Sequence, residues 1–280
     1  QSCPSSAYSC THGSTSTSGT QYYGGACSAA ASTCSLTINS CKAGYYKDGN
    51  SCKECPSGYT SADGTTGGIG SCYMSVPAGK YVKNAHDSSA STCVAGTSKA
   101  AHTVYYGSTS SCAVCDTNSY SDAGAGSCKS CNTTNKYYNS GSAAANHANV
   151  TSCKTTCAAG TRVVNANEAC STPSGNTWYT GSHTVSQTQI SPYSTCPTGY
   201  TTRGSTAAYH DAKSDCKIDC DAGTQVAAAD AVCTTPNSSN WYTEDHTVSA
   251  TATSSSSGYV KSCNTTNKYY NSGSAAANHA

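Results

Sequence analysis

The sequence predicts a small disulfide-rich fold of β-hairpins and loops, arranged as an elongated tandem-repeat rod with little helix and no large core. The chain has 21 cysteines in 280 residues and no Phe, and Leu, Ile and Val together number only 18. So few apolar side chains do not offset a backbone entropy cost of ~1–2 kcal/mol per ordered residue. Cystines, at about 2–4 kcal/mol each, are expected to supply the missing stability. Internal repeats are the third observation.

Two repeats divide the chain. Residues 157–186 recur at 220–249 with a shift of 63, and residues 131–148 recur letter for letter at 263–280. A shorter motif, C-x-A-G, begins at Cys41, Cys93, Cys157 and Cys220, with a cysteine-less relative at 76–79. The predicted parts are a Cys-containing segment 1–40, a hairpin module 41–72, modules 73–130, a repeat unit 131–219, a copy of the 157–199 type at 220–262, and the start of a further repeat at 263–280.

Twenty of the cysteines are expected to form disulfides, and Cys263 is left over. Because Cys263 opens a copied segment, we favour a partner beyond Ala280, and a free or intermolecular thiol is the alternative. Spacing does not determine connectivity, although Cys41–Cys52 and Cys55–Cys72 look like natural partners. The twenty are Cys3, Cys10, Cys27, Cys34, Cys41, Cys52, Cys55, Cys72, Cys93, Cys112, Cys115, Cys128, Cys131, Cys153, Cys157, Cys170, Cys196, Cys216, Cys220 and Cys233.

Aromatic pairs such as Tyr45-Tyr46 and Tyr137-Tyr138 precede Gly and Asn residues. Tyr favours strands, while Gly and Asn favour turns, so each unit is predicted to be a short hairpin clamped by cysteines. Aromatic rings are expected to pack over the cystines, with sugar stacking or oxidative cross-linking as the alternatives. Helical periodicity is absent apart from one turn expected at 143–145.

The stretch Cys41–Cys72 follows the pattern C-x-x-G-Y-Y…G…C-x-x-C-P-x-G-Y…G…C. It resembles the cysteine-rich repeats of ephrin-receptor-like, tumour-necrosis-factor-receptor-like and EGF-like ectodomains. The resemblance covers residues 93–131 less closely and the 63-residue units only in pieces. It implies extracellular, elongated, disulfide-laddered modules without catalysis, and it implies no particular ligand.

Composition indicates an oxidising, extracellular location. N-linked glycans are expected at the sequons of Asn132, Asn149, Asn237 and Asn264, while the Ser/Thr-rich stretches 14–20 and 251–257 are either O-glycan carriers or plain loops. The chain begins at Gln1 without a leader-like segment, which we interpret as a mature secreted product or a fragment.

Charge and hydropathy exclude several classes of partner. Only 10% of residues are charged and the formal net charge is +1, with no basic cluster, so binding to nucleic acid or anionic lipid is not expected. No apolar run approaches the ~18–20 residues that span a bilayer, so no transmembrane segment is expected.

The spacing of Cys112, Cys115, Cys128 and Cys131 has the outline of a four-thiolate zinc site. The repeat itself generates this spacing, and oxidised cysteines cannot bind zinc, so we favour disulfides. Thioredoxin-like chemistry would need an α/β scaffold that the sequence does not predict.

Three histidines, His102, His183 and His246, share the context H-T-V. Their recurrence predicts a packing role beside Trp178 and Trp241, with a repeated metal or glycan contact as the alternative. The sequence contains no G-x-S-x-G motif and no paired carboxylates, and the glycine-rich 66–70 is expected to be a turn. No catalytic residue, metal or cofactor other than glycans is therefore expected, and the chain is not expected to be an enzyme.

The predicted function is structural: a secreted, glycosylated repeat subunit that self-associates into an extracellular filament, coat or matrix. The alternative is an adhesin or receptor ectodomain that binds a protein or carbohydrate. A ligand site should break the repeat, and the unmatched segment 1–40 leaves room for one.

Overall fold

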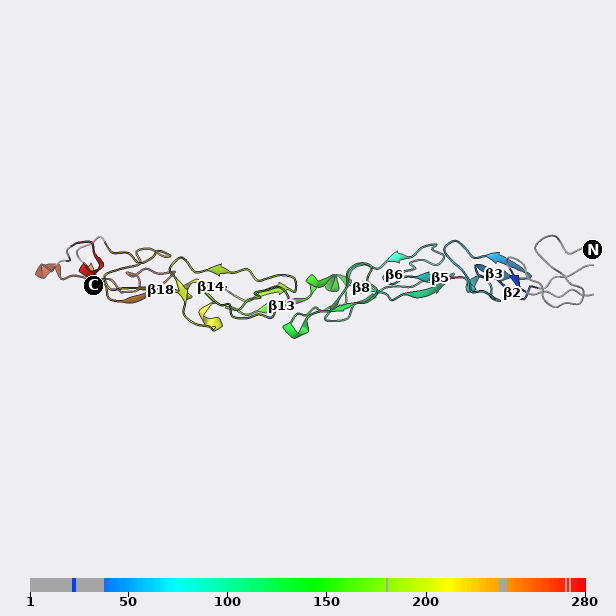
Figure 1. Ribbon diagram of the computed structural model, residues 1–280, viewed down its shortest axis with the longest axis horizontal. Coiled ribbons are helices and arrows are strands. Elements are labelled where there is room, and N and C mark those ends of the chain that lie inside the picture. Colours follow the sequence, from blue (N-terminus) through cyan, green and yellow to red (C-terminus); the bar gives the residue numbers. More distant parts are fainter. Residues whose placement is uncertain (1–21, 24–37, 180, 237–240, 270, 272) are drawn as a thin grey trace, which may run out of the picture. The chain divides into compact units, whose positions relative to one another are not determined.

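The computed structural model describes residues 22–23, 38–179, 181–236, 241–269, 271 and 273–280 (Figure 1). These residues form two compact units. Unit 1 comprises Gln1–Ser130 and Asn139–Asn149, and unit 2 comprises Cys131–Tyr138 and Val150–Ala280, in each case as far as the chain is described. The predicted sites at Cys3, Cys10, Cys27, Cys34 and Asn237 lie outside the described residues.

The predicted fold class is confirmed: the described chain consists of small antiparallel strand pairs, loops and disulfides, and none of its helical turns exceeds four residues (Figure 1). In unit 1, strands pair as β1–β2, β3–β4, β5–β9, β6–β7, β8–β10 and β11–β12. Their bounds are β1 Tyr22–Tyr23, β2 Ser40–Cys41, β3 Tyr45–Asp48, β4 Ser51–Glu54, β5 Tyr73–Val76, β6 Lys80–Tyr81, β7 Ser91–Thr92, β8 Thr97–Ser98, β9 His102–Tyr105, β10 Ala113–Val114, β11 Ser119–Tyr120 and β12 Lys129–Ser130.

Unit 2 contains the pairs β13–β15, β14–β16 and β19–β21 and one three-stranded sheet in the order β17–β18–β20. Its strands are β13 Lys154–Cys157, β14 Thr177–Trp178, β15 His183–Ser186, β16 Ser194–Thr195, β17 Thr201–Thr202, β18 Cys216–Cys220, β19 Trp241–Tyr242, β20 His246–Ser249 and β21 Lys261–Ser262.

Within the described chain, only β3 and β4 form the tight hairpin predicted for the aromatic pairs. Asp48 pairs with Ser51, and Gly49 takes the positive φ of 60° that the two-residue turn requires. The consecutive pairs β6–β7 and β11–β12 are also antiparallel, with longer loops. Other aromatic pairs do not form a local hairpin: β14 pairs with β16 across a long loop, and Tyr138 makes only an isolated bridge to Lys154.

Eight disulfides are present among the described residues, and each closes a loop with a sequence separation between 11 and 22. A bridge of this span lowers the conformational entropy of the unfolded chain and thereby raises the free energy of unfolding by about 3 kcal/mol. The two pairs singled out from spacing are among them. The disulfides are Cys41–Cys52, Cys55–Cys72, Cys93–Cys112, Cys115–Cys128, Cys131–Cys153, Cys157–Cys170, Cys196–Cys216 and Cys220–Cys233.

The buried side chains form small clusters in which cystines are mixed with valines. In unit 1, Cys55 and Cys72 pack with Tyr59, Met74 and Val104, among others. In unit 2 the corresponding cluster comprises Tyr200, Cys216, Ile218, Cys220, Val226, Val248 and Ala250. Aromatic rings over cystines therefore describe only part of the core, because strand alternation turns single Val, Ile or Met side chains onto the same buried face.

The helical turn expected at 143–145 is η3, a 3₁₀ turn at Ala144–His147, but it is not the only one described. Turns of three or four residues are too short to leave a helical period in the sequence. The others are η1 Ile69–Ser71, η2 Thr133–Asn135, η4 Val150–Ser152, η5 Ala207–Tyr209, η6 Lys213–Asp215, η7 Thr265–Asn267 and η8 Ala276–Asn278. An asparagine side chain caps η2 and η7, whereas η3 has no side-chain cap.

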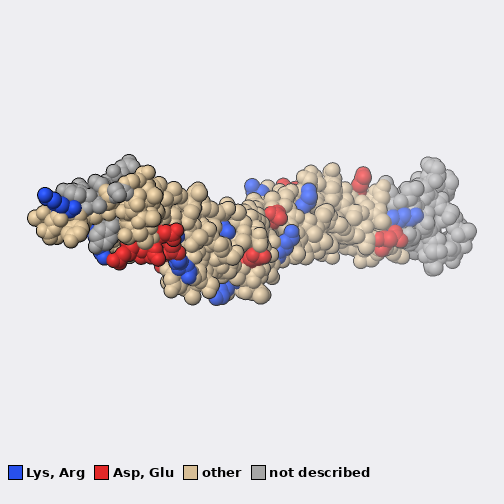
Figure 2. All heavy atoms as spheres, turned by 60° about the vertical axis from the view of Figure 1, so that its left-hand side comes forward, with Lys and Arg blue, Asp and Glu red and all other residues tan. Residues whose placement is uncertain are grey.

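The surface is sparsely charged, and the face in Figure 2 is mostly uncharged with small groups of both signs. The ion pairs in the described chain are solvent-exposed, such as Lys213–Asp230 and Lys261–Glu244, and pairs of this kind contribute little to stability. No helix among the described residues is long and apolar enough to cross a membrane.

Candidate functional site

One strand arrangement occurs three times, each time around an H-T-V strand. The histidine of β9, β15 or β20 pairs with a residue 26 positions earlier: His102 with Val76, His183 with Cys157 and His246 with Cys220. The cysteine-less motif at 76–79 is therefore structurally equivalent to the two cysteine-bearing copies.

Each copy contains a group that we call the serine–histidine node: a valine, an H-T-V histidine and a serine eight residues after it. In unit 2 the N–H of Val163 donates to Oγ of Ser191 at 2.9 Å, and Nε2 of His183 lies 2.7 Å from that oxygen. The valine carbonyl accepts the N–H of the serine, at 3.0 Å. The other nodes are Val82, His102 and Ser110, and Val226, His246 and Ser254.

Neighbouring carbonyls fix the tautomer in two nodes. Nδ1 of His102 lies 2.9 Å from the carbonyl oxygen of Ala100, and Nδ1 of His246 lies 2.5 Å from that of Glu244. A carbonyl only accepts, so Nδ1 carries the hydrogen and Nε2 of the neutral ring accepts. The serine hydroxyl therefore accepts from the valine amide and donates to the histidine.

A serine bonded to a histidine resembles an activated nucleophile, but the geometry here favours a structural role. Ser191 and Ser254 are fully buried, and each oxygen holds a main-chain amide. Packing of these histidines beside Trp178 and Trp241 stays a prediction. The ring contacts described for two of them are with tyrosines: the ring centroids of Tyr179 and His183 lie 4.0 Å apart, and those of Tyr259 and His246 lie 4.7 Å apart.

Replacing Ser191 with Ala is expected to destabilise unit 2 by about 1–3 kcal/mol, because the buried amide of Val163 and Nε2 of His183 both lose their partner. The measurement is the urea midpoint of unfolding followed by tryptophan fluorescence. Ser71→Ala is the control, since its hydroxyl bonds only to local, exposed carbonyls. Equal midpoints for the two variants would show that the node contributes nothing.

Acid is expected to weaken unit 2 through His183. Burial lowers the pKa of this histidine, and the carbonyl of Gly181 opposes the effect only in part. The unfolded chain then binds a proton at a higher pH than the folded one, so the contribution of neutral His183 is complete above the unfolded pKa of about 6.5 and is lost as pH falls below it. Urea midpoints at pH 7.5 and 5.5 should differ more for the natural chain than for His183→Gln.

A second recurring group joins successive motifs, and we call it the glycine–histidine junction. In unit 2 the N–H of Gly160 donates to the carbonyl of Tyr179 at 3.2 Å, and the N–H of Tyr179 donates to the carbonyl of His210 at 2.8 Å. One residue thus bridges two other segments through its own main chain. The same pattern links Gly96, Ser121 and His147 in unit 1, and Gly223, Thr243 and His279 in unit 2.

The glycines of these junctions are in close contact with a carbonyl of a 3₁₀ turn. Gly160 has φ +72°, and a Cβ added there would lie 2.0 Å from the oxygen of Ala207, the first residue of η5. A Cβ on Gly96 or Gly223 would lie 1.9 or 1.8 Å from the oxygen of Ala144 or Ala276. Only glycine allows both the backbone conformation and this approach.

The junction histidines are buried and contact main-chain carbonyls. In His147, which is fully buried, Nδ1 lies 2.8 Å from the oxygen of Ser119 and Nε2 lies 2.8 Å from that of Gly141. In His210 the corresponding carbonyls are those of Thr177 and Gly204. In these two histidines the Nδ1 contact connects the 3₁₀ turn to an earlier strand, β11 or β14.

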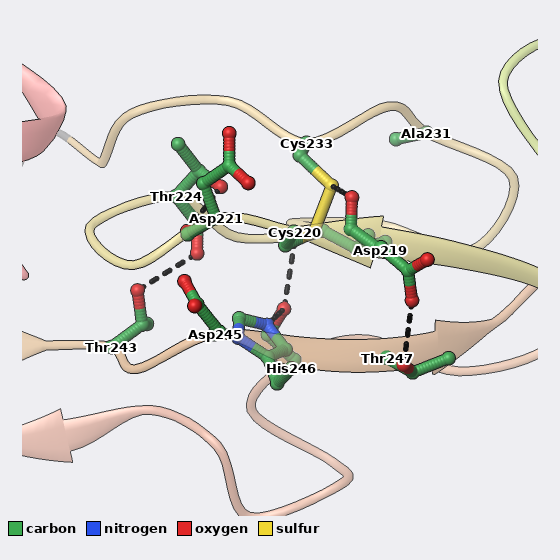
Figure 3. Close-up of a disulfide and its surroundings, with 12 residues drawn as sticks. Asp219, Cys220, Asp221, Thr224, Ala231, Cys233, Thr243, Asp245, His246 and Thr247 are labelled. Carbon is green, nitrogen blue, oxygen red and sulfur yellow. Dashed lines mark hydrogen bonds between the residues drawn. A yellow bond between two sulfur atoms is a disulfide. The ribbon is translucent and has the colours of Figure 1, made fainter.

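Figure 3 shows the Cys220–Cys233 disulfide beside the β18–β20 pair. Oγ1 of Thr243 accepts the N–H of Gly223 at 2.9 Å and donates to the carbonyl of Thr224, so the junction is reinforced by a side chain. On the other side of the disulfide, the Arg203 guanidinium and then the Thr247 hydroxyl lower the pKa of Asp219.

The cysteines of the zinc-like spacing are divided among three disulfides. Cys112 pairs with Cys93, Cys115 pairs with Cys128, and Cys131 pairs with Cys153. Their sulfurs are therefore not available as thiolate ligands.

The described sequons differ in their surroundings. Asn132 caps η2 and donates from Nδ2 to Oδ1 of Asn167 at 2.9 Å, and Asn149 is half-buried with φ +59°. Asn264 caps η7 and is exposed. Of the described sequons, Asn264 presents the most accessible side chain for a glycan.

A shallow hollow of about 260 Å³ lies in unit 2, lined by Trp178, Tyr179, Pro192, Tyr193 and Ser194. The Arg162 guanidinium lies 4.0 Å above the Tyr193 ring, which is half-exposed. The hollow breaks the repeat, because a shift of 63 residues replaces Pro192 and Tyr193 with serines and Arg162 with glutamine.

Sequence reasoning missed the serines of the nodes and the histidines of the junctions. A signal for each was present: a serine follows every H-T-V histidine by eight residues, and His147 and His210 are separated by the 63-residue period. What the sequence does not indicate is that these side chains bond to main-chain groups of distant motifs.

Comparison with known protein families, with curated proteins and with solved structures finds no match for this chain.

Proposed function

We propose that this chain is a structural protein: a secreted repeat subunit of an extracellular filament, coat or matrix. The observation that carries the proposal is the glycine–histidine junction, which occurs three times and each time connects a C-x-A-G motif to later segments through main-chain atoms. A chain of such motifs can be lengthened by adding further copies. Near-equivalent contacts between neighbouring chains build a filament when they do not close into a ring.

The disulfides support an extracellular location. Eight bridges among the described residues are typical of a protein from an oxidising compartment. A relation to ephrin-receptor-like, tumour-necrosis-factor-receptor-like or EGF-like modules, and an elongated rod, belong to the same proposal.

The recurring polar groups support mechanical rather than catalytic use. Each serine–histidine node holds a main-chain amide, and three copies of one group suit a repeated fastening better than a single reaction centre. We therefore propose that the chain is not an enzyme and that it acts without a cofactor.

Electron microscopy of the secreted chain at increasing concentration tests the proposal. Ordered fibres or sheets with a repeat along their length are the expected result. Dispersed particles at every concentration, with no assembly in the secreted material, would contradict a filament, coat or matrix.

A second candidate function is carbohydrate binding at the aromatic hollow, because this site departs from the repeat as a ligand site should. Aromatic faces beside Ser194 and Arg162 suit the apolar face and hydroxyls of a sugar ring. Screening against a glycan array tests it: a saturable ligand lost in Tyr193→Ala but kept in Tyr259→Ala would place the site at this hollow.

A further inference from the structure

The segment Cys263–Tyr269 has the same sequence as Cys131–Tyr137 and the same local structure. In η2 and η7 an asparagine caps the turn, and the residue that follows the turn, Lys136 or Lys268, has φ of 62° or 60°. The N–H of the tyrosine donates to the carbonyl of the capping asparagine at 3.1 Å in both copies. The conformation therefore forms without help from any neighbour that only one copy has.

In the first copy, a later stretch of chain covers this segment. Cys131 is bonded to Cys153, and the hydroxyl of Tyr137 donates to the carbonyl of Glu168 at 2.8 Å. The N–H of Asn132 donates to Oε1 of Gln187 at 3.0 Å. The remaining contacts run from Nδ2 of Asn132 and Asn135 to Asn167, and between the main chains of Tyr138 and Lys154.

In the second copy, the same residues face solvent. Tyr269 is 66% exposed, whereas Tyr137 is fully buried. Cys263 is the free cysteine of the described chain and is only half-buried. Residues 55–60 and 196–201 share the pattern C-P-[ST]-G-Y-T. The hydroxyl of its Tyr200 donates to a carbonyl 31 residues later, as that of Tyr137 does. Tyr200 and the equivalent Tyr59 are both buried, so the exposure of Tyr269 is the exception.

The copied stretch 263–280 is anchored at its C-terminal end, beyond Cys263–Tyr269. The N–H of Thr243 donates to the carbonyl of His279 at 2.8 Å, and Ala276 contacts Gly223 as the first residue of a junction turn does. Cys263–Tyr269 therefore belongs to a stretch that is fixed to unit 2, while its own side chains, apart from half-buried Cys263, remain exposed to solvent.

We propose that Cys263–Tyr269 is a docking surface for an extended polypeptide segment of the Val150–Gln187 type. The segment brings a cysteine at the place of Cys153, main-chain carbonyls at the places of Asn167 and Glu168, and a glutamine at the place of Gln187. The two thiols form one disulfide, and their two protons and two electrons pass to a small-molecule disulfide, which is reduced to two thiols. This inference does not depend on the filament proposal.

The test compares the 280-residue chain with an extended chain in which residues 149–191 are repeated directly after Ala280, as they follow Ala148. Both chains are oxidised in a glutathione buffer, Cys263 is labelled with iodoacetamide, and the disulfides are mapped by mass spectrometry. We expect labelling of Cys263 to be lost in the extended chain and Cys263 to be linked to the added cysteine that corresponds to Cys153.

A matched extension with the same cysteine positions and otherwise shuffled residues is the control, and it should leave Cys263 open to labelling or mixed in its pairing. Tyr269→Ala in the extended chain should also reduce selective pairing. The proposal is overturned if Cys263 remains labelled in the extended chain, or if the shuffled extension pairs with it equally well. Electron microscopy of the 280-residue chain tests the filament separately.

Discussion

Gly160→Ala is expected to destabilise unit 2 by about 2–5 kcal/mol. Two costs add in this variant. Alanine at φ +72° is strained, and its Cβ would lie 2.0 Å from the carbonyl oxygen of Ala207. Main-chain atoms of η5 must then move, which would also disturb the bond from Tyr179 to His210. The measurement is the urea midpoint followed by tryptophan fluorescence.

Gly44→Ala is the matched control for this prediction. Gly44 belongs to the same C-x-A-G motif and has φ +86°, but a Cβ there would have nothing within 4 Å. Its cost should be limited to the strain of the backbone, about 1–2 kcal/mol. Hydrogen exchange of unit 1 measures this cost locally. If Gly160→Ala costs no more than Gly44→Ala, the close contact at the junction does not contribute to stability.

Removing the Cys196–Cys216 disulfide is expected to cost about 3 kcal/mol or more. The bridge closes a loop with a sequence separation of 20, and Cys216 is fully buried in the cluster around Tyr200. Trp178 packs against the same cluster, so its fluorescence reports the loss directly. The double variant Cys196→Ala with Cys216→Ala should unfold at a clearly lower urea concentration than the natural chain.

The control for the disulfide is Cys263→Ala, which removes a cysteine and leaves all eight described bridges intact. We expect it to change stability by less than about 0.5 kcal/mol. Similar midpoints for the two variants would mean that valines and hydrogen bonds, rather than cystines, supply most of the rigidity of unit 2.

The sequence predicted the parts of the fold that depend on local chemistry. Cysteine density predicted the class, and Gly49 predicted the turn of the β3–β4 hairpin. It did not predict that β14 pairs with β16, because strands of only two residues, Thr-Trp and Ser-Thr, carry no alternation that would identify a partner. Val163 also gave no signal of burial, because Val163 and Val164 form a short apolar pair within a polar stretch and only Val163 is buried.

For the candidate site, recurrence identified the histidines but not their partners. His183 and His246 could be identified because both begin an H-T-V sequence and they lie 63 residues apart. Ser191 did not, because serine is common throughout the chain, and only the structure shows its oxygen between an amide and an imidazole. The carbonyl of Ala207 could not be found from sequence at all, since a main-chain contact leaves no trace in residue type.

Contacts between main-chain atoms leave the loops between them free to change in length. From junction glycine to touching alanine the chain runs from Gly96 to Ala144, from Gly160 to Ala207 and from Gly223 to Ala276, three intervals of unequal length bridged in the same way. Insertions and substitutions can thus accumulate in such a protein while its architecture persists. Distant descendants of one ancestral unit would then share a geometry long after any recognisable likeness between their sequences had faded.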